Sequence, residues 1–341
     1  MTTLDFFGVP AQVARSAARF ARFAGLAALV ASAALVSFKA AADEVTLPSL
    51  IKIVVPFGPG GSNDIAARMV AQLLGPRIGK SVIVDNRPGA SGFIGAGAVA
   101  RAPKDGSTLL LTSSSMVTAA ATKQTVPIDI LNDLAPVSIL SESPLLIIVA
   151  KQSKIKTPED LVAAARANPD MITNGTPGVG TISHLSGELL NDIANIKLRH
   201  IPYTGGGPAL IDLLGDRIDI NIVSNSSSAA YMADGTLRPI ALSWTKPSTS
   251  FPNVPPMASA APGFDVSQWQ AVWAPAGTPK PILDRLNREI NEIVKTPEFA
   301  VLLRDDGGVP QADTPAEADK KIRASYEMWS KLAKAKNLVF D

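Results

Sequence analysis

Short apolar runs alternate with segments of helical spacing in the first part of the chain after residue 50. The runs that we interpret as β-strands are residues 51–57, 82–85 and 108–112. After Gly61, apolar residues recur at Ile65, Met69 and Leu73, which is the i, i+4, i+8 spacing of one helix face. Alternation of strands and helices with short connections predicts an α/β fold with a parallel sheet that is covered on both faces.

A second series of the same kind begins near Lys151. Its expected helices are residues 158–168, 181–192, 208–214 and 226–233, and its expected strands are residues 172–176, 197–203, 218–224 and 237–244. A proline-rich stretch follows, then a strand at residues 266–275 and two long amphipathic helices. The apolar stripe of the last helix predicts packing against the core, and it consists of Ile322, Tyr326, Trp329 and Leu332.

The first 42 residues have the pattern of a secretory signal peptide. Arg15, Arg19 and Arg22 precede an apolar run at residues 23–38, and three alanines at residues 40–42 offer a cleavage site before Asp43. The run is too short and too weakly apolar for a typical spanning helix, although an uncleaved N-terminal anchor is the alternative. We therefore expect a signal peptide at residues 1–42 and a periplasmic location.

Composition narrows the class of protein. Without residues 1–42, the 32 basic and 30 acidic residues become 28 and 29, so the mature chain is nearly neutral and no basic patch indicates nucleic acid. The chain has no cysteine and two histidines, which leaves little from which to build a zinc site. We expect no metal, no cofactor and no nucleic-acid partner.

Two glycine-rich turns that each follow a strand carry the candidate chemistry. The first contains Phe57, Pro59, Gly60 and Gly61, and the second contains Gly89, Ala90 and Ser91. Such turns present free backbone N–H groups at a helix N-terminus, where the macrodipole favours negative charge. Prolines stiffen the first turn, so its N–H groups are aimed before a ligand arrives. Together the two turns predict a cradle for an anion, although the glycines could instead serve only close packing of strand on helix.

Six stretches in sequence carry a family resemblance. They read IVVPFGPGGSNDIAAR, VIVDNRPGASGFIGA, APKDGSTLLL, NGTPGVGTISHLSGELL, HIPYTGGGPALIDLLGDRIDI and WAPAGTPKPILDRLN, and they cover nearly all of the chain after the signal region. The chain resembles the periplasmic solute-binding proteins of tripartite tricarboxylate transporters, the Bug family. The resemblance implies a two-lobed Venus-flytrap fold, type II-like, in which each lobe is a mainly parallel sheet flanked by helices. Family members hold a small carboxylate through loop amides and ordered waters.

This resemblance also sets the expected domain organisation. Residues 43–148 and 266–341 form the first lobe, and residues 149–265 form the second, with hinge strands at 144–150 and 266–273. Ligand binding closes the lobes, and integral membrane transporter subunits then recognise the closed form. We expect a monomer.

Further candidate ligand residues follow other strands. Thr112 and Ser113 end the third strand, and the second lobe contributes Gly175, Thr176, Thr181, Ser183, His184, Ser224 and Asn225. His184 either touches the ligand or supports the residues that do, while His200, at a strand edge, is expected to be structural.

The residues at 223–225 depart from the family pattern. Relatives often carry an aromatic residue and then an aspartate before the asparagine, whereas this chain has Val223, Ser224 and Asn225. An aspartate would favour an amino group or a hydroxyl-rich ligand, and a serine is neutral. We therefore hypothesise an aliphatic dicarboxylate or an aromatic carboxylate rather than an amino acid.

Enzyme motifs are missing from the sequence. Glycines at 89, 92 and 95 do not match the dinucleotide pattern, the first turn lacks the Lys-Ser/Thr of a P-loop, and neither G-x-S-x-G nor H-E-x-x-H occurs. We therefore expect no enzyme. An exported hydrolase is the weaker alternative, and a ligand-reporting subunit of a sensor system would use the same cleft with a different partner.

Overall fold

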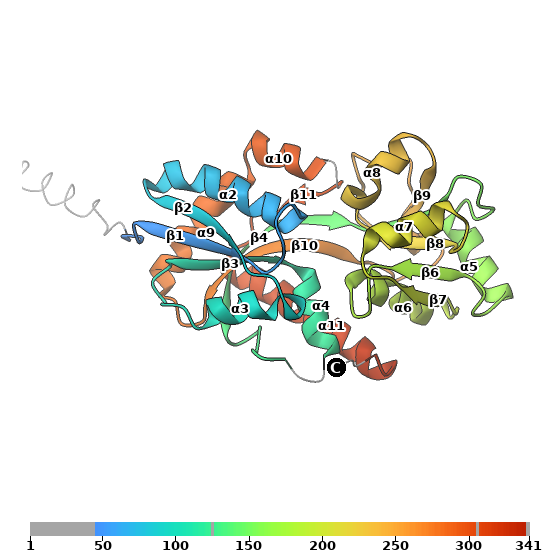
Figure 1. Ribbon diagram of the computed structural model, residues 1–341, viewed down its shortest axis with the longest axis horizontal. Helices are drawn as coiled ribbons and strands as arrows, with labels where there is room; N and C mark the ends of the chain where they lie inside the picture. The colour runs from blue at the N-terminus through green and yellow to red at the C-terminus, as the bar shows by residue number, and fades with distance from the viewer. Residues whose placement is uncertain (1–44, 124–125, 305–306, 339–341) are drawn as a thin grey trace, which may run out of the picture. The chain divides into compact units, whose positions relative to one another are not determined.

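The strands of the chain form two sheets in the computed structural model, which describes residues 45–123, 126–304 and 307–338 (Figure 1). The expected signal peptide at residues 1–42 lies outside the described residues. Both sheets belong to one compact unit, Leu47–Asp341. None of the helices among the described residues has the length and apolar character needed to cross a membrane.

The first sheet has six strands in the order β11-β4-β10-β3-β1-β2. Their bounds are β1 (Leu50–Val55), β2 (Ser81–Asn86), β3 (Thr108–Ser113), β4 (Leu134–Pro144), β10 (Ser267–Pro275) and β11 (Val309–Pro310). β1 pairs in parallel with β2 and β3, whereas β10 pairs antiparallel with both β3 and β4. The last strand to be synthesised before the C-terminal helices therefore lies in the middle of this sheet.

Helices cover both faces of the first sheet. On one face lie α2 (Ser62–Ile78), α9 (Lys280–Val294) and α10 (Pro297–Arg304), and on the other lie α3 (Phe93–Ala100), α4 (Ser114–Thr122) and the first half of α11 (Pro315–Ala335). The strands are apolar on both sides because both sides are buried: Ile53 packs with the α2 face and Val54 with the α3 face. We call this sheet with its helices the first lobe.

The second sheet has five strands in the order β7-β6-β8-β5-β9. The strands are β5 (Leu146–Ala150), β6 (Thr173–Thr176), β7 (Arg199–Pro202), β8 (Ile220–Val223) and β9 (Leu237–Leu242). One face packs against α5 (Pro158–Ala167), α6 (Ile182–Ala194) and the C-terminal part of α11, and the other packs against α7 (Gly206–Leu214) and α8 (Asn225–Ala233). This sheet with α5 to α8 is the second lobe.

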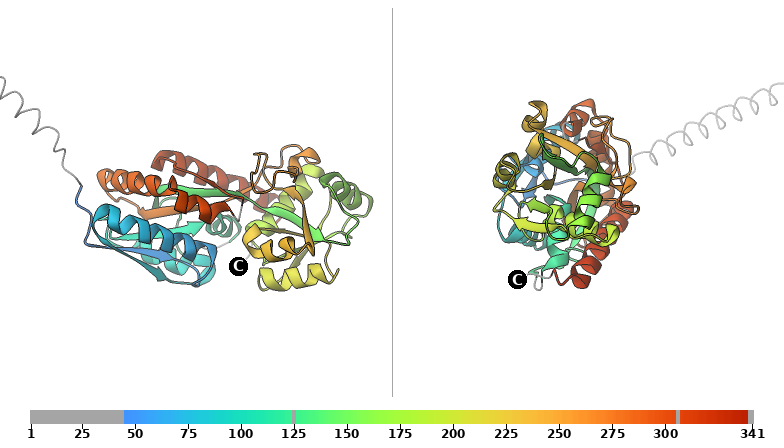
Figure 2. Two further views of the ribbon diagram at one scale, coloured as in Figure 1. Left: turned by 90° about the horizontal axis from the view of Figure 1, so that it is seen from above. Right: turned by 90° about the vertical axis from the view of Figure 1, so that its right-hand side faces the viewer.

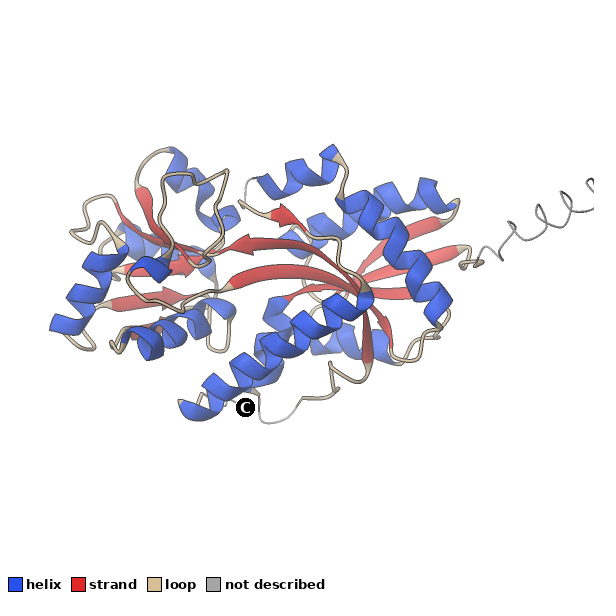
Figure 3. Cartoon of the chain, turned by 180° about the vertical axis from the view of Figure 1, so that it is seen from behind, coloured by secondary structure: helices blue, strands red, loops and turns tan. Residues whose placement is uncertain are grey.

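Two strand connections and one helix join the lobes (Figure 3). β4 ends at Pro144 and β5 begins at Leu146, so Leu145 alone separates the two sheets there. The chain returns from β9 through a long segment to β10, which pairs with β4 from Ser267 onward. α11 buries Ile322 in the first lobe and Trp329 in the second.

The two lobes lie end to end, and the crossing strands run between them, as Figure 2 shows for residues 47–341. The apolar stripe predicted for α11 is confirmed, since Ile322, Trp329 and Leu332 are buried and Tyr326 packs against them. Both predicted sheets exist, but they are mixed rather than mainly parallel. Among the named strands, parallel pairing is confined to β2-β1-β3 and β7-β6-β8, because β4 and β5 run toward the second lobe whereas β10, which pairs with β4, runs back from it, and β8 and β9 run opposite to β5.

The buried face of α2 is displaced by one position from the spacing seen in the sequence. Ala66, Val70 and Leu74 are fully buried, whereas Ile65 is 46% exposed. The small side chain of Ala66 lets the helix lie close to the sheet, and this turns Ile65 away from the core. The sequence analysis also did not anticipate β4 or the short helix α10.

Candidate functional site

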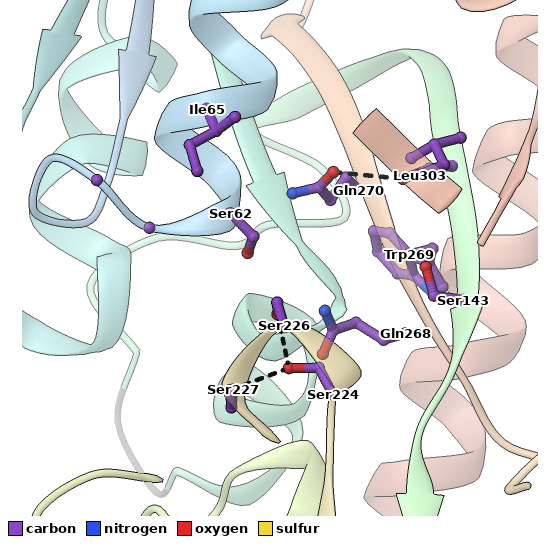
Figure 4. A pocket seen from close by; sticks show the side chains of 13 residues that line it. Ser62, Ile65, Ser143, Ser224, Ser226, Ser227, Gln268, Trp269, Gln270 and Leu303 are labelled. Atoms are coloured by element: carbon purple, nitrogen blue, oxygen red, sulfur yellow. Dashed lines mark hydrogen bonds between the residues drawn. The ribbon is translucent and has the colours of Figure 1, made fainter. Parts of the chain in front are cut away.

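A cavity of about 490 Å³ lies where the crossing strands meet the first turns of two helices, one from each lobe (Figure 4). We call it the central cavity. Its lining residues are Gly60, Gly61, Ser62, Ile65, Ser141, Ser143, Ser224, Ser226, Ser227, Gln268, Trp269, Gln270 and Leu303. They come from the β1–α2 turn and α2, from β4 and β10, from α10, and from the start of α8.

The β1–α2 turn forms the first-lobe wall, and Asp64 fixes its shape. The backbone N–H of Gly60 donates to the Asp64 carboxylate at 2.9 Å, and Arg68 donates to both oxygens of that carboxylate. Asn86, at the end of β2, donates to Asp64 and to the carbonyl of Phe57. The Arg68 hydrogen bond, aided by those of Gly60 and Asn86, lowers the pKa of Asp64 to about 2. The carboxylate therefore stays ionised and holds the turn in place.

Gly60 and Gly61 differ in what they require of the backbone. Gly60 has a φ of +85°, a conformation that disfavours other residues, whereas Gly61 has an ordinary φ of −79° and precedes α2 as its N-cap. No side chain caps this helix, so its first-turn N–H groups are not satisfied by a capping hydroxyl. Both glycines line the central cavity, which brings the positive end of the α2 dipole to its wall.

The start of α8 forms the second-lobe wall. Ser224 is the N-cap, and its hydroxyl lies 3.2 Å from that of Ser226 and 3.3 Å from that of Ser227. The helix begins after the buried strand β8, which places this turn at the carboxyl end of a strand. Ligands of open α/β sheets bind at such positions.

The crossing strands form the back of the central cavity. Gln270 of β10 donates from Nε2 to Asn63 Oδ1 at 3.1 Å, and it accepts at Oε1 from the Ser141 hydroxyl of β4 at 3.3 Å. Gln268, two positions along β10, points toward the α8 turn (Figure 4). Leu303 of α10 supplies apolar surface, and Trp269 lines the cavity from its position between the two glutamines on β10. The back wall is therefore part of the connection between the lobes.

The second glycine-rich turn has an unusual backbone. Four successive residues, Gly89, Ala90, Ser91 and Gly92, all have positive φ, at 127°, 47°, 56° and 97°. Two of them carry side chains, and such residues cost of order 1–3 kcal/mol each. A Cβ at Gly95 would lie 2.9 Å from the Pro56 side chain, so this turn packs directly on the first one. Gly89, Ala90 and Ser91 are not among the residues lining the central cavity.

Thr112 and Ser113 lie at the end of β3 and are buried. Thr112 Oγ1 has no hydrogen-bond partner among the described residues, which is uncommon for a buried hydroxyl. Neither residue lines the central cavity, and neither do Phe57 and Pro59 of the first turn. Their predicted role as ligand residues stays a prediction.

Thr176 and Thr181, two of the remaining second-lobe candidates, contact a stacked pair of histidines. The rings of His184 and His200 lie 3.7 Å apart between centroids, at an angle of 17°. His184 Nδ1 accepts from the Gly180 N–H at 3.1 Å, and His200 Nε2 lies 2.5 Å from Thr176 Oγ1. Burial lowers the pKa of each ring to about 4, and repulsion from His200 adds to the effect at His184. Both rings are therefore neutral at pH 7.

These contacts tie the β6–α6 turn to the ring pair. Thr181 caps α6 by accepting from the His184 N–H, and its hydroxyl donates to the Gly178 carbonyl at 2.8 Å. Gly175 is crowded, since a Cβ there would lie 2.2 Å from Ile218. Gly175, Thr176, Thr181, Ser183, His184 and Asn225 do not line the central cavity. Gly60, Gly61 and Ser224 are the residues of the predicted set that do.

Sequence reasoning missed the hydroxyl and amide groups of β4 and β10. Ser141, Ser143, Gln268 and Gln270 occupy strands that meet only in the folded sheet, 120 or more residues apart in the chain. Polar residues inside a strand that is otherwise apolar, as in SQWQAVWAP, were the one available signal. Among the described residues, no group of three or more His, Cys, Asp and Glu side chains is placed to hold a metal ion.

Comparison with known proteins adds independent information. Residues 66–338 match the tripartite tricarboxylate transporter family receptor. The solved structure of the periplasmic binding protein BugD is 30% identical, covers 85% of this chain and 98% of its own, and gives a TM-score of 0.71.

Two further structures come from Rhodopseudomonas palustris and contain ligands. Rpa4515 with adipate is 31% identical, covers 84% of this chain and 96% of its own, and has a TM-score of 0.72. MatC with malate is 26% identical, covers 83% of this chain and 98% of its own, and has a TM-score of 0.70.

Proposed function

Because this chain belongs to the tripartite tricarboxylate transporter receptor family, the Bug family of periplasmic solute-binding proteins, we propose that it captures a small carboxylate between its two lobes for uptake. The family is one of non-enzymatic receptors, so the task of the site is to bind and release. The observation that carries the proposal is the central cavity, where helix N-termini of both lobes meet.

Electrostatics support a carboxylate as the ligand. The first turns of α2 and α8 place partial positive charge on two sides of the cavity, and backbone N–H groups bond more strongly to an ionised carboxylate than to a neutral acceptor. The Asp64 network holds the α2 turn in one shape before the ligand arrives, which reduces the ordering entropy lost on binding. Relatives solved with adipate and malate are consistent with this chemistry.

The predicted cradle extends this site beyond the central cavity. In our proposal, the turns at Gly89–Ser91 and Gly175–His184 reach the ligand when the lobes close, since both turns precede helices and follow strands of the two sheets. Closure occurs about Leu145 in the first crossing and near Val266 in the second. The lobes then comprise residues up to 145 with 266–341, and residues 146–265, which is close to the division expected from the sequence.

The proposed partners follow from the family. We infer that integral membrane transporter subunits recognise the closed form, and that the protein reaches the periplasm through the signal peptide expected at residues 1–42 and acts as a monomer. A sensor partner would use the same closed form. Which of the two partners, transporter or sensor, binds the closed form depends on the surface that the partner contacts.

Tryptophan fluorescence of the exported protein tests carboxylate binding. All four tryptophans are buried, and Trp269 lines the central cavity, so a ligand there changes its surroundings. Succinate, malate, tartrate, adipate, citrate, benzoate and aspartate are titrated in turn. We expect saturable binding of at least one carboxylate, with a rise in unfolding free energy of about 2.7 kcal/mol at 100 times its Kd. A flat response to every acid, by fluorescence and by calorimetry, would contradict the proposal.

A further inference from the structure

The side chains of the central cavity are polar but carry no charge. Among residues 45–123, 126–304 and 307–338, its lining contains six serines and two glutamines, with Ile65, Trp269 and Leu303 as the apolar residues, and no Asp, Glu, Lys, Arg or His. Carboxylate sites commonly use a guanidinium or ammonium group, and amino-acid sites use a carboxylate opposite the ligand's ammonium. Neither kind of charged side chain lines the described part of this cavity.

The two acidic side chains nearest to the lining in sequence are already engaged. Asp64 accepts hydrogen bonds from Gly60, Arg68 and Asn86. Glu142 lies between Ser141 and Ser143 on β4, so it faces the opposite side of the strand, where Lys246 and Ser267 donate to it. A ligand ammonium group in the cavity would therefore lose its hydration without gaining a counter-charge from any of the described side chains.

Several of the lining side chains keep unused hydrogen-bonding capacity. Within residues 45–123, 126–304 and 307–338, the side chains of Ser62, Ser143 and Gln268 make no hydrogen bond, although Ser143 is only 8% exposed. Gln270 uses one donor and one acceptor and retains one more of each. Serine hydroxyls and glutamine amides both donate and accept, which is also what a ligand hydroxyl does.

We propose that the ligand of this protein is a carboxylate whose carbon chain carries hydroxyl groups and no amino group. This inference rests on the proposed function and specifies its substrate class. It departs from the expectation at Ser224, which did not favour a hydroxyl-rich ligand, because the polar groups of β4 and β10 were not part of that expectation. The carboxylate is held by helix N-termini, and the hydroxyls along the chain pair with Ser143, Gln268 and Gln270. A ligand without hydroxyls leaves the remaining hydrogen-bonding capacity of these groups unused inside the closed site, which is an effective way for a site to reject an analogue.

Isothermal titration calorimetry of the exported full chain tests the proposal with matched acids. The four-carbon series is succinate, malate, tartrate and aspartate, and the six-carbon pair is adipate and galactarate. We expect affinity to rise with the number of hydroxyls, by about tenfold or more from succinate to tartrate or from adipate to galactarate. Aspartate should bind at least about tenfold more weakly than malate, since the two differ only in the amino group that replaces the hydroxyl.

Variants connect the preference to the cavity. Ser143→Ala and Gln268→Leu should each weaken binding of the preferred hydroxylated acid about tenfold while changing the affinity for its hydroxyl-free analogue less than about threefold. Ser330→Ala, on α11 outside the cavity, is the matched control and should leave both affinities unchanged. Unaltered melting temperatures of the free variants show that they fold.

The outcomes separate this inference from the proposed function. If succinate or adipate binds as tightly as its hydroxylated analogue, or aspartate as tightly as malate, the substrate class is wrong and carboxylate capture stands. If hydroxylated acids bind more tightly than their analogues but both cavity variants keep the full difference in affinity, the assignment to these side chains is wrong. If no acid binds, the proposed function fails and the substrate class fails with it.

Discussion

Asp64 shows how one buried charge shapes the candidate site at the residue scale. It lies in the first turn of α2, where a negative charge suits the helix dipole, and it satisfies the Gly60 N–H that the tight turn would otherwise leave unpaired. Its partners come from α2 and from β2, so the turn is tied to two separate elements. The geometry of the cavity wall thus depends on a side chain that does not line the cavity.

Asp64→Ala should destabilise the fold and weaken ligand binding. The substitution leaves the Gly60 N–H and the Asn86 amide without their acceptor, so the unfolding free energy should fall by about 1–3 kcal/mol. Urea unfolding and calorimetry measure the two effects. Asp284→Ala, which removes an exposed carboxylate paired with Lys280, is the matched control and should cost less than about 0.5 kcal/mol. Equal effects of the two substitutions would argue against a special role for Asp64.

Two neighbouring glycines allow a steric test of the cavity wall. Gly58 and Gly61 both have ordinary φ values and open space where a Cβ would lie, but only Gly61 lines the cavity. Gly61→Ala should therefore lower ligand affinity about tenfold, because the methyl group occupies ligand space, and should cost no more than about 1 kcal/mol of stability as a poorer N-cap, while Gly58→Ala should bind normally. Titration of both variants with the best acid of the panel measures this. Normal binding by Gly61→Ala would remove the turn from the site.

Only some of the individual site residues could be predicted from the sequence. The turn glycines and Ser224 stand out because glycine and N-cap residues have conformational roles that are readable locally. Gln268 and Gln270 do not, because which face a strand residue occupies depends on the register of β10 against β3 and β4. Two register shifts in the β10–β4 pair make that choice unpredictable from alternation alone.

At the element scale, α11 is the part of the chain that both lobes share. Its N-terminal half contributes Ala318 and Ile322 to the first-lobe core, and its C-terminal half contributes Trp329 and Leu332 to the second-lobe core. A capping box at Thr314 and Glu317 fixes its start. The helix therefore has to accommodate any change in the angle between the lobes.

Trp329→Ala should destabilise the protein by about 3–5 kcal/mol, because the indole is 1% exposed within the second-lobe core. The adjacent Met328 is 37% exposed, so Met328→Ala should cost less than about 1 kcal/mol. Thermal and urea unfolding of the two variants measure the difference. Similar costs for both positions would mean that α11 does not anchor in the second lobe as described.

The histidine pair of α6 and β7 predicts a loss of stability in acid. Each ring has a folded pKa of about 4 against 6.5 when exposed, so the unfolded chain binds more protons between these values. The stabilisation is complete above pH 6.5 and is lost as the pH falls toward 4, by about 1.4 kcal/mol per pH unit for each ring. Urea unfolding at pH 7.5 and 4.5 measures the loss.

The double variant His184→Gln with His200→Gln isolates this contribution. Other titrating groups, including Glu188, whose pKa is raised by burial, remain in both proteins and cancel in the comparison. The variant should show a shallower fall in stability between pH 6.5 and 4 than the parent. Identical slopes would mean that the stacked rings do not titrate in this range.

Most helices and strands could be predicted from the sequence, and there are physical reasons why the others were missed. The strands that end in glycine-rich turns are short and apolar, so their type and position are readable. β4 contains two prolines and three serines in LAPVSILSESP and looks like a loop, yet it is buried because β10 and β11 pair with it on either side. Its prolines are tolerated at 136 and 144 near the irregular positions and the end of the ladder.

At the scale of the whole molecule, two strand crossings and one helix, α11, connect the lobes. The strand crossings involve few residues, whereas α11 packs along both cores. Leu145 is the single residue between β4 and β5, and Ser243 bridges the crossings by accepting from the Leu145 N–H and donating to the Val266 carbonyl. Lys246 and Ser267 both bond to Glu142 beside them. A hinge built in this way bends at a few backbone positions while its strands stay paired.

Ligand binding should make the protein more compact. In small-angle X-ray scattering, the radius of gyration should fall as the preferred carboxylate is added, and the change should be half complete when the free carboxylate concentration equals the Kd measured by calorimetry. Gly61→Ala should show the same fall only at proportionally higher concentration. A radius that stays constant at saturation would mean that this protein binds its ligand without closing.

The central position of β10 has a consequence for how the chain folds. β10 lies between β3 and β4, yet it is synthesised more than 120 residues after either of them, when the strands of the second sheet are already complete. Until it arrives, β3 and β4 expose unpaired edges, and closing so long a loop makes that step slow. The sheet of the second lobe can pair before β10 is made, whereas the sheet of the first lobe must wait for it. The half that begins the sequence thus contains the sheet that is completed last, and both cores are completed only when α11 packs on them.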